Sequence, residues 1–135
     1  MSGDTPARGY LLDTHTALWA LESPEKLSSA ARAAILAGPN FLSLVSWWEV
    51  VIKSMKGKLD AGDPREWWRE VLDQLVATPL ALRPDHVGAV CSLPPIHNDP
   101  FDRMLIAQAT AERLALVSSD SAVARYASKS LRVIG

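Results

Sequence analysis

The chain has 135 residues and a formal net charge of −1 at pH 7, a length typical of one domain with a sizeable buried core. Its hydrophobic content of 48% excludes a disordered chain, and the charge gives no global positive field that would attract nucleic acid. The single cysteine, Cys91, cannot form an internal disulfide, which favours a reducing cytoplasm. We find no signal peptide and no membrane-length apolar run.

Short apolar runs alternate with helical patterns along the chain. A polar segment at 1–8 is expected to be a flexible tail, followed by a single domain over 9–135. The first half predicts, in chain order, a strand at 9–13, a helix at 14–27 broken by Pro24, a helix at 28–38, a strand at 40–46 and helices at 47–59 and 63–78. The second half predicts a strand at 79–84, helices at 85–93 and 100–114, a strand at 115–119, a helix at 121–128 and a strand at 131–135.

Strands that alternate with helices predict a parallel sheet covered by helices on both faces. The predicted strands are short and apolar and lack a period of two, which fits strands buried on both sides. Open sheets of this kind bind ligands outside the carboxyl ends of their strands. Reactive side chains at those ends are therefore candidates for a functional site.

Acidic residues stand at the carboxyl ends of the predicted strands. Asp13 ends the first strand, and Asp120 follows the strand at 115–119. Glu49 comes just after the strand at 40–46, in the first turn of its helix, and Asp102 lies in the first turn of the helix that leads into the strand at 115–119. Parallel strands place these ends at one edge of the sheet, so four acids are expected to converge.

Each of these acids could simply cap a helix, since acidic residues favour helix N-termini. Ser46 with Glu49 matches a capping box, and Asp99 with Asp102 does so in outline. Neutral Ser, Thr or Asn would cap as well, however, and converging carboxylates repel one another unless a cation lies between them. Oxygen ligands without a Cys or His cluster favour a hard cation, Mg²⁺ or Mn²⁺.

The segments "YLLDTHTALWAL", "SWWEVVIKSMKGKL", "HNDPFDRMLIAQA" and "LALVSSD" resemble the PIN domain, and more narrowly the VapC-type toxin ribonucleases of bacterial toxin–antitoxin pairs. The resemblance runs from about Tyr10 to Tyr126. It implies a three-layer α/β/α sandwich with a central parallel sheet of four to five strands. It also implies a Mg²⁺- or Mn²⁺-dependent endoribonuclease that cleaves single-stranded RNA, a cognate antitoxin, and a homodimer. The catalytic and metal-binding residues implied are Asp13, Glu49, Asp102 and Asp120.

Other residues near these acids have two interpretations each. Ser118 or Thr14 could hold an acid or a water in place, although Thr14 could only cap its helix, and Asp99 is the expected N-cap of the helix at 100–114. Arg103 could bind phosphate or pair with an acid, and Lys53 could meet RNA phosphates or remain a solvated lysine near a helix C-terminus. His97 could transfer protons, but a hydrogen bond within its loop is favoured.

Four tryptophans form two adjacent pairs, Trp47–Trp48 and Trp67–Trp68. Neighbouring residues on a helix point about 100° apart, so we expect that both rings of a pair cannot enter one pocket. Exposed aromatic side chains mark interfaces. Some of the four are therefore expected to line a groove that binds an antitoxin peptide.

Three other functions are consistent with acids at strand ends. A receiver-like phosphoryl-transfer domain would need a lysine after the strand at 115–119, and "VSSDSAV" contains none. A phosphatase of the haloacid-dehalogenase type would need Asp-x-Asp after the first strand, where His15 takes the second position. A PIN-like binding module without nuclease activity stays open.

Overall fold

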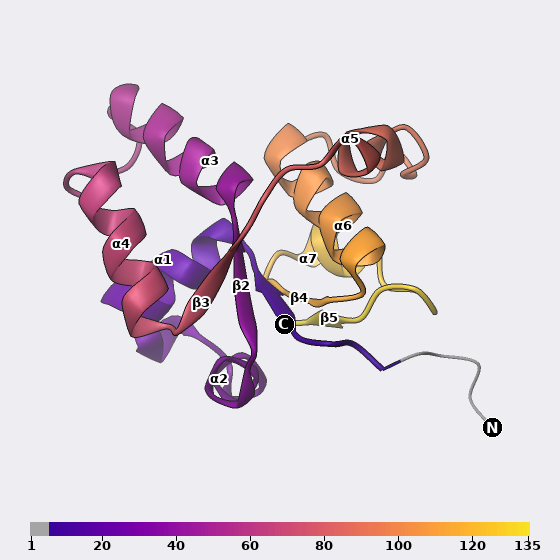
Figure 1. Ribbon diagram of the computed structural model, residues 1–135, viewed down its shortest axis with the longest axis horizontal. Helices are drawn as coiled ribbons and strands as arrows, with labels where there is room; N and C mark the ends of the chain where they lie inside the picture. The colour runs from indigo at the N-terminus through magenta and orange to yellow at the C-terminus, as the bar shows by residue number, and fades with distance from the viewer. Residues whose placement is uncertain (1–5) are drawn as a thin grey trace.

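The computed structural model describes residues 6–135 and has a sheet of five parallel strands in the order β3-β2-β1-β4-β5 (Figure 1). The strands are β1 (Tyr10–Leu12), β2 (Asn40–Ser43), β3 (Ala77–Leu80), β4 (Ala115–Val117) and β5 (Val133–Ile134). The helices are α1 (Thr14–Glu22), the 3₁₀ helix η1 (Pro24–Lys26), α2 (Ser29–Ala37), α3 (Leu44–Met55), α4 (Pro64–Gln74), α5 (Pro84–Val90), α6 (Pro100–Glu112) and α7 (Ser121–Ala124).

Helices cover both faces of the sheet, because successive strand residues point to opposite sides. Leu12 and Val117 face one apolar core, which α1, α2 and α4 complete, whereas Leu11 and Leu116 face a second core formed with α6 and α7. Figure 1 shows the two groups of helices on opposite sides of the strands. The predicted three-layer α/β/α architecture with a parallel sheet is confirmed.

The start of α3 differs from the prediction. β2 ends at Ser43, where its pairing with β3 stops, and the Ser43 hydroxyl oxygen caps α3 by accepting from the N–H of Val45 at 3.0 Å. Ser46 therefore lies inside the helix, and the capping box predicted for Ser46 and Glu49 is wrong. Glu49 stands in the second helical turn rather than the first. An apolar run suits a buried strand and a buried helix equally, so its pattern could not locate this boundary.

The tryptophans are more buried than predicted. Trp67 and Trp68 both belong to the first core, at 3% and 8% exposed, so neither indole of this pair is available to line an exposed groove. Trp47 stacks on Trp68 with ring centroids 4.9 Å apart, and its indole N–H donates to the carbonyl of Pro64. Trp48 alone of the four is exposed, at 59%. Three of the four indoles, from α3 and α4, are thus part of the first core or packed against it.

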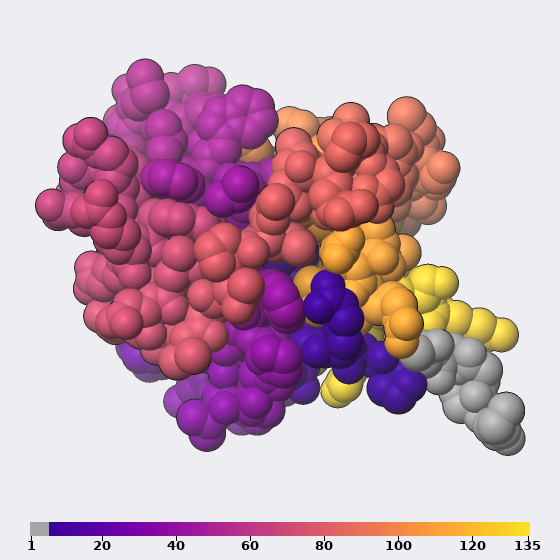
Figure 2. Space-filling view, in the orientation of Figure 1, coloured from indigo at the N-terminus to yellow at the C-terminus, as the bar shows by residue number. Residues whose placement is uncertain are grey.

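The beginning of the described chain is attached to the end of α6. Arg8 donates from Nε to the carbonyl of Glu112 and forms an ion pair with its carboxylate at 3.1 Å. The space-filling view shows this segment, in indigo, against the orange end of α6 (Figure 2). Residues 1–5 of the predicted flexible tail lie outside the described residues. Within 6–135, every helix is too short or too polar to cross a membrane.

Candidate active site

Asp13 and Asp120 lie at the same edge of the sheet because they follow the paired strands β1 and β4. Each also begins a helix: Asp13 accepts from the N–H of Thr16 at 2.8 Å, and Asp120 accepts from the N–H of Ala122 at 2.8 Å. Both the capping and the clustering predicted for these two acids therefore occur together. Asp13 is buried at 5% exposed, whereas the Asp120 side chain is 41% exposed.

Ser118 connects these two acids. Its hydroxyl oxygen accepts from the N–H of Asp120 at 3.2 Å, and its side chain also hydrogen-bonds Asp13. Burial raises the pKa of Asp13, while the hydrogen bonds from Ser118 and Thr16 act in the opposite direction. The ionised form of Asp13 is thus costly in this place without a nearby positive charge.

Asp102 stands in the first turn of α6, whose N-cap is Asp99. The Asp99 carboxylate accepts from the N–H groups of Phe101 at 2.8 Å and Asp102 at 3.1 Å, which is the capping arrangement predicted from the sequence. Pro100 occupies the first helical position, as expected for a residue that lacks an N–H. The cap leaves the carboxylate of Asp102 available for other partners.

The pKa of Asp102 is raised by the acids that lie near it. Burial and the negative charges of Asp99, Asp13 and Glu49 raise its pKa to about 6, and a hydrogen bond from His97 opposes them only in part. Carboxylates raise one another's pKa when they lie close together. Acids from three separate segments of the chain, represented by Asp13, Glu49 and Asp102, therefore lie close enough together to affect one another's charge.

Glu49 differs from the other acids because both of its oxygens already have partners. The Thr14 hydroxyl donates to Oε1 at 2.6 Å, and Oε2 forms an ion pair with Lys53 one turn later on α3. The side chain is 4% exposed. Ser46 completes the arrangement with its hydroxyl 3.0 Å from that of Thr14. Glu49 thus joins α1 to α3 and holds a lysine beside the acids.

Lys53 lies within the field of the acidic cluster. Burial lowers the pKa of its ammonium group, but the hydrogen bond to Glu49 and the charges of Asp99 and Asp102 outweigh that effect and raise it. The ammonium group is therefore a permanent positive charge at the edge of the acidic site.

His97 makes the bond within its own loop that was expected, because its Nδ1 accepts from the N–H of Asp99 at 3.5 Å, and it also contacts the acids. Its Nε2 lies 2.8 Å from Oδ2 of Asp102 and 3.6 Å from Oδ2 of Asp120. The guanidinium of Arg103 fixes this loop by donating to the carbonyls of His97, Pro94 and Val90. Within residues 6–135 Arg103 makes no ion pair with an acid, so it reaches the site only through His97.

Sequence comparison decides the family. Residues 10–129 match the family profile described as PIN domain. The chain belongs to the PIN-domain family. It is also 30% identical to Ribonuclease VapC22 of Mycobacterium tuberculosis over 112 residues, which are 82% of this chain and 85% of that relative.

Solved structures share the fold of this PIN domain. A toxin–antitoxin complex from Klebsiella pneumoniae matches with a TM-score of 0.63 and 19% identity, covering 93% of this chain and 96% of that one. A DNA-bound VapBC from Salmonella typhimurium matches with a TM-score of 0.66 and 14% identity over the same shares. At these identities the likeness concerns the fold.

The donor atoms of this PIN domain suit a divalent cation. One ligand atom each from His97, Asp102 and Asp120 lie within 4.8 Å of one another, close enough to share one ion. Buried Asp13 and half-buried Asp102 both have raised pKa values, which a bound cation would lower. A donor set rich in carboxylate oxygen is the kind that Mg²⁺ and Mn²⁺ prefer.

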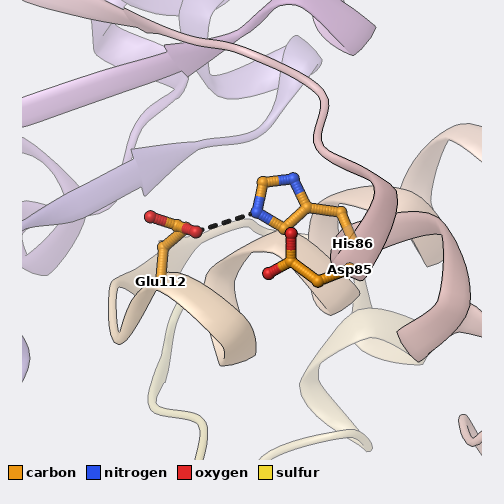
Figure 3. Close-up of side chains that lie close together, drawn as sticks. All are labelled: Asp85, His86 and Glu112. Atoms are coloured by element: carbon orange, nitrogen blue, oxygen red, sulfur yellow. Dashed lines mark hydrogen bonds and ion pairs between the residues drawn. The ribbon is translucent and has the colours of Figure 1, made fainter.

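A second group of side chains could also offer metal ligands, and it consists of Asp85, His86 and Glu112 (Figure 3). Hydrogen bonds and an ion pair explain why these side chains lie close together. Nδ1 of His86 accepts from the N–H of Arg83 at 3.1 Å, so Nε2 carries the proton and donates to Glu112 at 2.9 Å. Asp85 pairs with Arg83 instead. The hydrogen bond from His86 is the main reason that the pKa of Glu112 is lowered. This cluster attaches α5 to the end of α6.

Proposed function

We propose that this PIN domain is a metal-dependent endoribonuclease toxin that cleaves single-stranded RNA and is neutralised by a cognate antitoxin. The observation that carries the proposal is the convergence of Asp13, Glu49, Asp99 and Asp102 in one electrostatic cluster. A relative named Ribonuclease VapC22 and neighbours titled as toxin–antitoxin and VapBC complexes support the RNA substrate and the protein partner.

The surroundings of each site residue support a particular role for it in metal binding or in positioning. Asp13, Asp102 and Asp120 would hold Mg²⁺ or Mn²⁺, and Glu49 would contribute from its buried position by fixing Thr14 and Lys53. Such an ion lowers the pKa of a bound water and neutralises charge that develops on the phosphate. The remaining residues would have supporting roles: Ser118 would orient Asp13, His97 would orient Asp102 and Asp120, Arg103 would hold the loop of His97, and Asp99 would cap α6. The contacts described above support these roles.

The partners proposed are an antitoxin and a second copy of the chain, acting in the cytoplasm. With Trp47, Trp67 and Trp68 largely packed inside, Trp48 is the tryptophan available to a partner. It is 59% exposed and lies edge-to-face with Phe101 of α6, at 5.7 Å between ring centroids.

Cleavage of a single-stranded RNA by the purified protein tests the proposal. We expect EDTA to abolish cleavage, Mg²⁺ or Mn²⁺ to restore it, and Asp13→Asn to remain inactive under both conditions. A protein that binds RNA but never cleaves it would be a binding module instead. Full activity in chelator would contradict the metal-dependent mechanism.

A further inference from the structure

The C-terminal end of α3 brings two lysines together. The N–H of Lys58 donates to the carbonyl of Lys53 at 2.9 Å, and the N–H of Gly57 donates to the carbonyl of Ser54 at 3.1 Å. Gly57 has φ +70°, a left-handed conformation that favours glycine. These are the two hydrogen bonds of a Schellman motif. The motif turns the chain back so that residue 58 lies beside residue 53.

The residues at these two positions are unusual for the motif. A Schellman motif is frequently accompanied by an apolar contact between the residue after the glycine and the last helical turn. Here both positions carry a positive charge. Lys53 is neutralised by Glu49, whereas Lys58 forms no ion pair within residues 6–135 and is exposed. Two lysines and one carboxylate among the residues that line the same cavity leave a net positive charge that can attract an anion.

Both lysines line a cavity next to the acidic site. It has a volume of about 280 Å³, and its lining residues are Thr14, His15, Leu18, Glu49, Lys53, Lys58 and Leu59. Thr14 and Glu49 also belong to the acidic cluster, so the cavity and that cluster share a wall. Its size is near the lower limit of ligand pockets, which suits one small planar group.

The other residues that line the cavity offer apolar and aromatic surface. Leu18 is buried at 7% exposed, Leu59 is half-buried, and the imidazole of His15 is exposed beside Trp19. Unpaired bases stack on aromatic side chains, including histidine, and pack on apolar ones. The cavity therefore combines an anion-binding side with a side that accepts a base.

We propose that this cavity binds the RNA nucleotide next to the one that is cleaved, with its phosphate on Lys58 and its base between His15 and Leu59. The proposal rests on the proposed ribonuclease function. It makes Lys58 and His15 RNA-binding residues that hold the strand in register with the acids. Their contribution is to substrate binding, and the acids retain the chemistry.

The test compares Lys58→Met with Lys56→Met, because Lys56 is also exposed but does not line the cavity. Binding of a fluorescent single-stranded RNA of mixed sequence is measured in the Asp102→Asn protein at several salt concentrations. We expect Lys58→Met to weaken binding at least about threefold and to reduce the salt slope by about 0.7, the value for one phosphate contact on a single strand. Lys56→Met should change neither.

Cleavage kinetics separate binding from chemistry. In the otherwise native protein, Lys58→Met and His15→Ala should raise KM and leave kcat near the native value. Thermal melting identifies any misfolded variant, and Lys58→Gln, which also removes the charge, replaces Lys58→Met if that variant does not fold.

Three results would overturn the proposal. If the native protein cleaves RNA but Lys58→Met behaves as Lys56→Met does, the cavity does not hold RNA although the ribonuclease function stands. If Lys58→Met loses affinity for the antitoxin and keeps its affinity for RNA, the cavity serves the protein partner. If the native protein neither binds nor cleaves RNA with Mg²⁺ or Mn²⁺, the proposed function fails together with this inference.

Discussion

At the scale of single residues, the carboxyl group of Asp102 affects the stability of the fold and belongs to the proposed active site. Its pKa is raised from 3.8 to about 6 by burial and by the neighbouring acids. Between these values the folded state binds more protons than the unfolded state, so this group makes the free energy of unfolding fall as the pH rises from about 4 to about 6. The metal-free protein therefore carries a destabilising charge at neutral pH.

Asp102→Asn should remove that charge. In EDTA, we expect the variant to melt about 2–5 °C higher than the native protein above about pH 6, and the difference to disappear below about pH 4. Differential scanning calorimetry over this pH range measures it, and cleavage assays should show no activity. A variant that melts at or below the native temperature at neutral pH would mean that Asp102 stabilises the metal-free fold.

Asp99 offers a matched comparison because it caps the same helix. Asp99→Ala should cost about 1 kcal/mol, as the loss of an N-cap does, and should keep substantial cleavage activity. Asp99→Asn retains a capping oxygen and should be close to native in stability. Denaturant unfolding and initial cleavage rates of both variants test this. If folded Asp99→Ala were as inactive as Asp102→Asn, Asp99 would belong to the metal site.

The sequence predicted where the acids lie but not every group they contact. Asp13 and Asp120 follow buried strands, and Asp102 begins a helix, so topology alone brings them to one edge. The contact of His97 with Asp102 depends on the path of its loop, which Arg103 fixes through backbone carbonyls. A sequence pattern does not encode hydrogen bonds to carbonyls, so the sequence left open whether that histidine contacts the acids.

Among the secondary-structure elements, β2 and α6 are joined by buried polar side chains. The Ser43 hydroxyl at the end of β2 donates to Oε1 of Gln108 at 2.6 Å, and Nε2 of Gln108 lies 3.3 Å from Nδ1 of His86. All three side chains are fully buried. The contact fixes α6, which carries Asp102, against the strand that leads into α3.

Gln108→Leu should therefore destabilise the fold. The change removes the acceptor of the Ser43 hydroxyl proton and one of the two donors to Nδ1 of His86, and a buried group that loses its hydrogen bond costs about 1–3 kcal/mol. Urea unfolding measures the loss. Gln74→Leu on α4 is the control, because Gln74 is exposed and bonds only Glu70 in the described chain, and it should change stability by less than about 0.5 kcal/mol. Equal effects of the two changes would argue against a specific role for the buried contact.

The boundaries of these elements show what a pattern of apolar residues can determine. The alternation of strands and helices was sufficient to predict a parallel sheet between two layers. The boundary between β2 and α3 was not predictable, since Ser43 and Ser46 are equally good caps. The strand ends at Ser43 because its pair with Leu80 is the last pair between β2 and β3. The strand order and the burial of Trp67 and Trp68 depend on contacts between distant segments.

For the whole molecule, the exposed side of α3 is the surface to test for self-association. Leu44 and Trp48 lie one turn apart on this helix and are 38% and 59% exposed. Residues four apart share a helix face, and Phe101 of α6 extends the apolar surface beside Trp48. Large aromatic residues are enriched among those that dominate binding energy at interfaces. The proposed homodimer is therefore expected to bury Trp48.

Trp48→Asp should convert that dimer to a monomer, because the change replaces a large apolar contact with a charge that would be desolvated in the interface. Light scattering coupled to size exclusion measures the mass of the native protein and of the variant. Leu36→Asp is the control, since Leu36 is 90% exposed but belongs to α2 rather than to the proposed surface of α3 and α6. Monomeric Trp48→Asp should keep its cleavage activity per chain only if each acidic site is complete within one chain. A native protein that is monomeric at high concentration, or a dimer that persists in Trp48→Asp, would contradict the assignment of this surface.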